Sequence, residues 1–212
     1  FLAYVPSLED TARGATLLRA AEARGVSLRP LTQEVLEEFA DTENPQGVLA
    51  VAETPTWRLD HLRPSGADGV ILILDAVQDP GNFGALARTA EALGALGIIA
   101  LPGTVDAWNP KAVRAAMGST FRLPTIGAGW EAAAPWLAAE GFAILAATAA
   151  GEPLRDPPRR AALVVGNEGA GISPESLHHA ALQVGIPLRG RAESLGVTAA
   201  AAILLHALLQ SR

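Results

Sequence analysis

The sequence contains no cysteine among its 212 residues. Disulfide bonds, zinc–thiolate sites and cysteine nucleophiles are therefore excluded, which suits a reducing, cytoplasmic compartment. Long apolar runs are also missing. The longest, Thr198–Leu209, contains His206 and is shorter than the roughly 18–20 residues that a membrane span needs. We therefore expect neither a membrane-spanning helix nor a signal peptide.

Charged residues are scarce, at 18% of the chain, whereas 50% of the residues are hydrophobic. This composition predicts one large or two small folded domains and not long-range disorder. The net charge of −6 argues against a nucleic-acid partner. However, residues 88–122 carry four basic side chains against two acidic ones, and residues 186–212 carry three against one. We therefore expect a local basic patch on an acidic body.

Lysine is almost absent, because Lys111 is the only one among the 16 basic residues. The arginines that replace it bind phosphate through paired hydrogen bonds. A GC-rich genome that favours arginine codons explains the same count, and both interpretations stay open. The four histidines show no metal-ligand spacing, so we expect no metal site; they are His61, His178, His179 and His206.

The hydrophobic pattern changes along the chain and predicts two parts joined by a linker. Residues 1–53 are expected to form a small α/β unit, with helices over Thr11–Arg24 and Thr32–Ala40 and strands over Val26–Leu31 and Gly47–Ala52. Residues 54–68, rich in proline and polar side chains, are expected to be a linker.

From residue 69 onward, predicted strands alternate with predicted helices, which indicates an α/β fold with a parallel sheet flanked by helices. The strands are expected at Val70–Leu74, Gly97–Leu101, Phe142–Ala146, Ala162–Val165 and Val184–Pro187, with an extended segment at Phe121–Ile126. The helices are expected at Asn82–Leu93, Pro110–Met117, Trp130–Glu140, Pro174–His179 and Glu193–Gln210.

A glycine-bearing turn follows the first of these strands and carries Asn82, Gly84 and Arg88. Such a turn exposes backbone N–H groups at a helix N-terminus, where anions bind, and Asn82 is the expected N-cap. An ordinary tight turn with a surface arginine remains the alternative. The Gly-x-Gly-x-x-Gly fingerprint is absent, which counts against a dinucleotide-dependent oxidoreductase.

Two further segments combine strand ends with glycine. Gly166–Gly171 places three glycines around Glu168 at the carboxyl end of a strand, where open α/β sheets bind ligands. Ile186–Thr198 leads into the final helix, which Ser194 is expected to cap. A glycine-rich turn with a solvated glutamate, and a merely capped helix, are the alternatives.

Together these segments resemble the SpoU-type RNA 2′-O-methyltransferases of the SPOUT superfamily, over residues 70–212. That family carries Asn-x-Gly-x-x-x-Arg, a Gly-Asn-Glu-Gly-x-Gly loop and Ile-Pro-Met-x-Gly-x-x-x-Ser-Leu-Asn-Val-Ser, matched here by Asn82–Arg88, Gly166–Gly171 and Ile186–Thr198. The stretch Lys111–Pro124 also resembles the family's pattern. Asp41–Val48 is similar to the end of its N-terminal recognition domain, so residues 1–53 are expected to be an incomplete or shortened form of that domain.

The resemblance implies a C-terminal trefoil knot, a homodimer with the active site near the subunit interface, and methyl transfer from S-adenosylmethionine to a ribose 2′-hydroxyl of structured RNA, either rRNA or tRNA. A related protein that binds RNA or cofactor without catalysis is the alternative. The cofactor contacts that the resemblance implies are Thr148, Gly166, Ile186, Leu188 and Leu195. The catalytic residues that it implies are Arg88, Asn82, Glu168 and Ser194. The RNA contacts that it implies are Arg88, Lys111, Arg114 and Arg122.

The sequence departs from the family pattern at one position of the third motif. Gly196 stands where the family usually has asparagine, while Thr198 keeps the hydroxyl of the family's serine. Since that asparagine helps to organise the catalytic end of the site, its absence predicts either less efficient methyl transfer or a shifted active-site network.

Overall fold

The computed structural model describes residues 1–40 and 44–210 and divides into two compact units, Phe1–Pro55 and Thr56–Arg212. The division falls within the segment 54–68 that was predicted to be a linker. The start of the Asp41–Val48 resemblance lies outside the described residues, as does Arg212, which contributed to the charge of the C-terminal segment.

The first unit is a small α/β unit, as predicted from the sequence. Its three-stranded sheet has the order β2-β1-β3. β1 (Leu2–Tyr4), which the sequence pattern did not predict, pairs parallel to β2 (Leu28–Pro30) and antiparallel to β3 (Val48–Ala50). The unit also holds η1 (Pro6–Leu8), α1 (Ala12–Glu22) and α2 (Gln33–Phe39). Thr32 caps α2 by accepting the Val35 N–H at 3.4 Å, as predicted.

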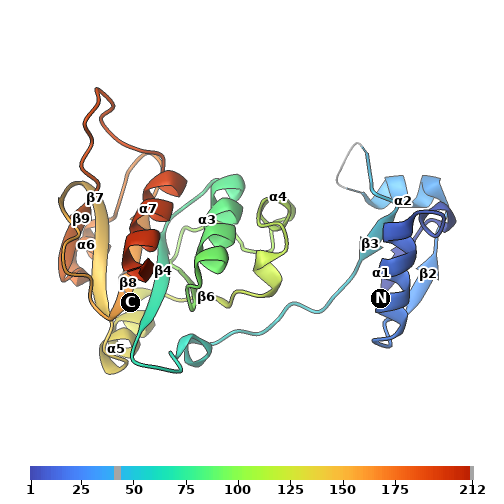
Figure 1. Ribbon diagram of the computed structural model, residues 1–212, viewed down its shortest axis with the longest axis horizontal. Coiled ribbons are helices and arrows are strands. Elements are labelled where there is room, and N and C mark those ends of the chain that lie inside the picture. The colour runs from blue at the N-terminus through green and yellow to red at the C-terminus, as the bar shows by residue number, and fades with distance from the viewer. Residues whose placement is uncertain (41–43, 211–212) are drawn as a thin grey trace. The chain divides into compact units, whose positions relative to one another are not determined.

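The second unit is built on a six-stranded sheet in the order β6-β5-β4-β8-β7-β9 (Figure 1). Every pair of neighbouring strands is parallel, which confirms the predicted sheet. The strands are β4 (Gly69–Asp75), β5 (Gly97–Ala100), β6 (Thr125–Gly127), β7 (Ala143–Pro153), β8 (Arg160–Gly166) and β9 (Leu182–Gly185). The helices are η2 (Leu59–Leu62), α3 (Pro80–Leu93), α4 (Pro110–Ala115), η3 (Ser119–Phe121), α5 (Trp130–Ala139), α6 (Pro174–His179) and α7 (Val197–Gln210).

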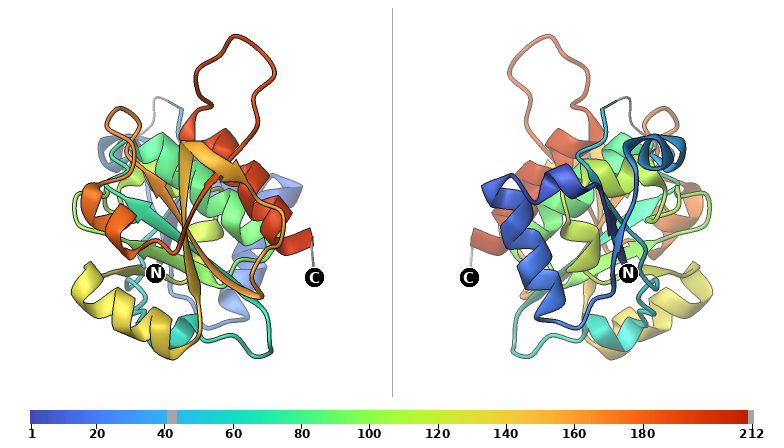
Figure 2. Two further views of the ribbon diagram at one scale, coloured as in Figure 1. Left: turned by 90° about the vertical axis from the view of Figure 1, so that its left-hand side faces the viewer. Right: turned by 90° about the vertical axis from the view of Figure 1, so that its right-hand side faces the viewer.

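Helices cover both faces of this sheet (Figures 1 and 2). Alternate side chains of a strand point to opposite faces, so a strand of apolar residues needs a covering layer on each side. Val70, Leu72 and Leu74 of β4 pack in one core with α3 and α7, which contact each other. Ile71 and Ile73 pack in a second core with α5. All five side chains are fully buried, and each such burial stabilises the fold by about 1.5–3 kcal/mol.

Strand β7 extends well beyond the predicted Phe142–Ala146 and contains an irregularity. Ala147 and Glu152 both pair with Val184 of β9, so residues 148–151 leave the ladder between them. The two chains meet closely here, since a Cβ on Gly151 would overlap the backbone of Val184 and Gly185. The displaced residues include Thr148, which lies at the carboxyl end of the sheet.

Two predicted boundaries differ from the structure. The predicted linker contains η2, and Leu62 of η2 is fully buried in the core beneath α5, so most of the segment packs on the second unit. The final helix begins at Val197 and not at Glu193. Gly196 takes the N-cap position, since its carbonyl accepts the Ala200 N–H at 3.0 Å; the prediction that Ser194 caps this helix is therefore wrong.

No helix in the described part of the chain has both the length and the apolar character needed to cross a membrane.

Candidate active site

Three segments from distant parts of the sequence meet at the carboxyl edge of the sheet. β4 and β8 are adjacent, and Asp75 pairs with Gly166 where the two strands end. The turn after β4 therefore lies beside the glycine-rich loop after β8. This turn, this loop and the segment after β9 surround a cavity of about 590 Å³. The residues that line it include Asn82, Ala147–Ala149, Val165–Gly169, Gly171, Ile172, Val184–Ile186, Leu188, Ser194–Thr198, Ala200 and Leu204.

Most of the residues singled out from the sequence line this cavity. All of the expected cofactor contacts do so, and so do three of the expected catalytic residues: Thr148, Gly166, Ile186, Leu188 and Leu195, with Asn82, Glu168 and Ser194. Arg88 is not among the lining residues, and it is exposed on α3.

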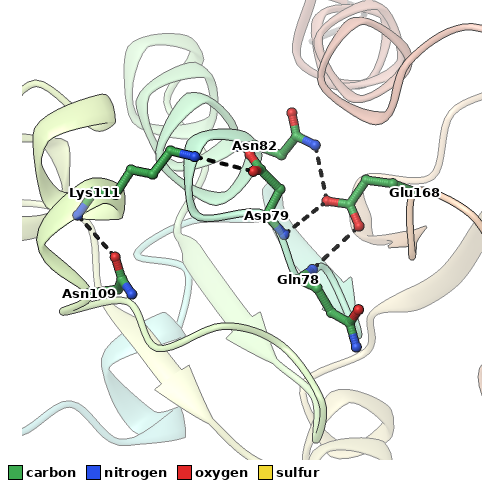
Figure 3. A network of polar contacts seen from close by, with 6 residues as sticks. All are labelled: Gln78, Asp79, Asn82, Asn109, Lys111 and Glu168. Carbon is green, nitrogen blue, oxygen red and sulfur yellow. Dashed lines mark hydrogen bonds and ion pairs between the residues drawn. The ribbon is translucent and has the colours of Figure 1, made fainter.

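Glu168 connects the loop after β8 to the turn after β4 (Figure 3). Its carboxylate accepts hydrogen bonds from Asn82 Nδ2 at 3.0 Å and from the backbone N–H groups of Gln78 and Asp79, both at 3.3 Å. Partial burial raises the pKa of Glu168, but the hydrogen bonds outweigh it and the net effect lowers that pKa. Glu168 is therefore ionised at neutral pH and acts as an acceptor that holds the two segments together.

The start of α3 is held by Asp79 and not by Asn82. Asp79 Oδ1 accepts the Asn82 N–H at 2.8 Å, and Pro80 follows at a position that favours proline; the prediction that Asn82 is the N-cap is wrong for this reason. Lys111 Nζ lies 3.5 Å from Asp79 Oδ2 (Figure 3). The Asn82 N–H first, and Lys111 after it, lower the pKa of Asp79. The Asn82 side chain therefore does not cap the helix and instead donates a hydrogen bond to Glu168.

Asp75 and Asn167 were missed by sequence reasoning, although they reinforce the same connection. Asp75, only 6% exposed, accepts the Ser173 N–H at 2.7 Å. Asn167 Nδ2 donates to the Ala76 carbonyl at 2.8 Å. The signal for Asp75 was its place directly after an apolar strand, where a charged side chain has to find a partner on a neighbouring strand end.

The glycine-rich loop has a shape that only small residues allow. The Asn167 and Gly171 backbones exchange two hydrogen bonds of 2.9 Å, and Gly171 has a φ of +73°. A Cβ on Gly166 would overlap the carbonyl of Gly171. The loop is thereby folded back over the end of β8, and its backbone forms one wall of the cavity.

Comparison with known proteins covers both units of the chain. Residues 69–206 match the SpoU rRNA Methylase family, and residues 4–57 match the RNA 2′-O ribose methyltransferase substrate binding family. The chain belongs to the SpoU rRNA methylase family. It is 38% identical to the 23S rRNA (guanosine(2553)-2′-O)-methyltransferase RlmP of Bacillus subtilis, over 86% of this chain and 72% of the relative.

Other members of the SpoU family are similar in sequence and in structure. The 23S rRNA (uridine(2479)-2′-O)-methyltransferase of Streptomyces viridochromogenes is 31% identical over 92% of this chain and 70% of its own. The solved structure of the SpoU methyltransferase AviRb from Streptomyces viridochromogenes, in complex with AdoMet, has a TM-score of 0.86 at 30% identity, covering 100% of this chain and 82% of that one. An AdoMet-bound rRNA methyltransferase from Sinorhizobium meliloti has a TM-score of 0.78 at 32% identity, covering 99% and 79%.

The cavity of this SpoU member offers both apolar walls and unused hydrogen-bond donors. Leu188 and Leu195 are 39% and 36% exposed and line it together with Ile186 and Leu204. Within the described chain, nothing accepts a hydrogen bond from the backbone N–H of Leu188 or Leu195. The described residues contain no group of three or more His, Asp or Glu that could hold a metal ion. The site is thus suited to an organic ligand that has both apolar and polar parts.

The basic side chains expected to contact RNA differ in whether another residue of the chain already binds them. Arg122 binds Glu91 through two hydrogen bonds of 2.9 and 3.2 Å, which raise the pKa of Arg122 and lower that of Glu91. Lys111 is engaged with Asp79, and Arg114 is exposed on α4. Arg88, in contrast, is exposed and has no hydrogen bond or ion pair with any residue that the structure describes. It is the expected RNA contact that is most accessible to a phosphate.

Proposed function

We propose that this protein transfers a methyl group from S-adenosylmethionine to a ribose 2′-hydroxyl of ribosomal RNA. The observation that carries the proposal is the single cavity in which the three SpoU motifs meet, lined by every residue expected to contact the cofactor. The names of the similar proteins support rRNA as the substrate, since several of them are 23S rRNA 2′-O-methyltransferases.

The cavity residues fit S-adenosylmethionine. Its volume of about 590 Å³ lies within the range of small-molecule sites. The adenine ring suits the apolar side chains of Ile186 and Leu188, and its nitrogen acceptors suit the unused N–H groups of Leu188 and Leu195. Gly166 lines the cavity and lets the loop fold close over the end of β8, and the hydroxyls of Thr148 and Ser194 suit polar groups of the ribose and methionine parts.

When bound, the cofactor supplies an electrophilic methyl group, so the protein needs no metal for this chemistry. The task of the protein residues is to position the 2′-hydroxyl and to assist in removing its proton. A guanidinium remains protonated in proteins, so Arg88 is suited to bind a flanking phosphate and orient the ribose and is a poor general base. Glu168 is held by Asn82 and two N–H groups, so its proposed role is to position Asn82 at the cavity.

Several expectations from the resemblance stay predictions. These are the trefoil knot, the homodimer with its active site near the subunit interface, and the RNA-recognition role of residues 1–53. Light scattering on the purified chain tests the dimer. Transfer RNA stays open as an additional substrate.

A transfer assay with two RNA substrates tests the proposal. Unmodified 23S rRNA and tRNA transcripts are incubated with tritiated S-adenosylmethionine, and cofactor affinity is measured separately by calorimetry. The wild-type protein is expected to label rRNA at 2′-hydroxyls. Cofactor binding without transfer to any RNA would instead favour the binding-protein alternative.

The Arg88→Ala variant tests the assignment of Arg88. We expect it to lose transfer while its cofactor affinity stays within about twofold of the wild type. Arg159→Ala is the matched control, because Arg159 is also exposed but precedes β8 at the opposite edge of the sheet. Full activity of the Arg88 variant would contradict the assignment.

A further inference from the structure

The segment between β9 and α7 projects from the second unit as a long loop (Figures 1 and 2). Its two flanks and its middle differ in chemistry. Leu188 and Leu195 line the cavity, whereas Arg189, Gly190 and Arg191 between them are exposed and do not line it. The same loop therefore carries apolar side chains toward the cofactor site and two guanidinium groups toward solvent.

We infer that Arg189 and Arg191 bind the ribose–phosphate backbone of the RNA substrate at the rim of the cavity, an inference that rests on the proposed function. Neither arginine has a hydrogen bond or ion pair among the residues that the structure describes. Glu193 is the single acidic residue of the segment 186–196, which is therefore net positive in a chain of net charge −6. Among the residues that the structure describes, the two charges thus have no ion-pair partner, unlike those of Lys111 and Arg122.

The position of the loop favours RNA as the partner. A ribose whose 2′-hydroxyl approaches the cavity carries a phosphate on either side, and these phosphates must lie at the cavity rim. Arg189 directly follows Leu188, which lines the cavity, and Arg191 is two residues further along the same loop. A guanidinium binds a phosphate through two parallel hydrogen bonds, so two free arginines match two successive phosphates in charge and in hydrogen bonding. Such contacts give affinity without reading the base.

The salt dependence of RNA binding tests the inference. A fluorescently labelled RNA hairpin serves as the probe, because phosphate contacts do not depend on sequence. Its affinity is measured by anisotropy over a range of KCl concentrations for the wild type and for Arg189→Gln/Arg191→Gln. Removing two phosphate contacts should reduce the slope of log K against log salt by about 1.5 and weaken binding about tenfold at low salt.

Two matched variants control for overall charge. Arg58→Gln/Arg159→Gln also removes two exposed arginines of the second unit and should bind the hairpin like the wild type. Arg189→Lys/Arg191→Lys keeps both charges and should retain most of the affinity and the full slope. Melting temperature and cofactor affinity are compared for all variants, so that a change in the fold is not mistaken for a lost contact.

The outcomes separate this inference from the proposed function. Wild-type affinity and slope in the Gln variant, or an equal loss in the Arg58/Arg159 control, would overturn the role of the loop even if the protein methylates rRNA. A wild type that needs Arg189 and Arg191 for RNA binding but methylates no RNA would overturn the proposed function and leave the inference standing.

Discussion

Gly166→Ala tests whether the glycine-rich loop after β8 builds the cofactor site. An added Cβ would overlap the Gly171 carbonyl and the Ile172 backbone nitrogen, neither of which can rotate away as a side chain could. The loop would have to open and break the two hydrogen bonds between Asn167 and Gly171. Each bond contributes about 1 kcal/mol, and overpacking of this kind costs about 1–3 kcal/mol.

The consequence for binding follows from these magnitudes. If the cofactor binds only the native loop, it has to restore that loop at a cost of about 2 kcal/mol, which raises the dissociation constant about thirtyfold. Calorimetric titration with S-adenosylmethionine measures this change directly. Because the strain acts on a loop at the edge of the sheet, the secondary structure of the variant should remain that of the wild type by circular dichroism.

Gly169→Ala is the matched control in the same loop. A Cβ there would meet only Asn167 Oδ1 at 3.7 Å, an ordinary contact, so cofactor affinity should stay within about twofold of the wild type. Wild-type affinity of Gly166→Ala for S-adenosylmethionine would refute the reasoning, since the loop would then accommodate a Cβ where the structure places backbone atoms of Gly171 and Ile172. An equal loss in both variants would show that the chain tolerates no alanine there, whatever the local packing.

Three further changes are predicted. Glu168→Gln should weaken the connection to Asn82 by about 1 kcal/mol and lower kcat more than cofactor affinity. Because the pKa of Glu168 is lowered in the fold, its stabilisation is present at neutral pH and lost as the pH falls through that lowered pKa, so the melting-temperature difference between wild type and variant should vanish in acid. Gly84→Ala would bring a Cβ within 2.5 Å of the Ala112 carbonyl and should lower the free energy of unfolding in urea by about 1–3 kcal/mol; an unchanged midpoint would contradict the close packing of α3 and α4. Gly196→Asn restores the residue usual in the family at an N-cap with open space around it, so the transfer rate should rise and the melting temperature should not fall; a slower enzyme would show that the site is adapted to glycine.

Buried strands were the most predictable part of the fold. The run Val70–Leu74 lies within β4, because an all-apolar stretch of that length has to be covered on both faces of a parallel sheet. The end of β7 was not predictable, since Ala147–Pro153 shows no alternation of apolar and polar side chains. Its backbone is held by Val184 and Gly185 of a strand more than thirty residues away, and local sequence does not contain that pairing.

Cap residues show a similar limit at the site itself. Asp79, Asn82, Ser194 and Gly196 all suit an N-cap, and preference alone does not choose among neighbours. For α3, Pro80 decides, because it fits the first helical turn directly after Asp79. No comparable signal marks Gly196, so the predicted start of α7 at Glu193 is four residues too early.

The motif Asn-x-Gly-x-x-x-Arg singles out Asn82 and Arg88 but does not say which way their side chains face. At about 100° per residue, Arg88 follows Asn82 by about 240° around α3, so the two side chains point in directions about 120° apart. Asn82 faces Glu168 and lines the cavity, whereas Arg88 is exposed. Helical geometry alone would have separated the residue that lines the cavity from the one that is exposed on the helix.

The connection between the first two motifs explains how a site made from distant segments keeps one shape. Asp75, Asn167 and Glu168 each bridge the turn after β4 and the loop after β8, through bonds of 2.7 to 3.3 Å. A ligand that settles against Gly166 on one side therefore fixes Asn82 and the start of α3 on the other. Since Arg88 is on that helix, a cofactor held at the loop and a phosphate held at Arg88, both as proposed above, would favour the same arrangement. Each ligand should then strengthen the binding of the other by an equal factor, as linkage requires, and Glu168→Gln should reduce that factor toward one.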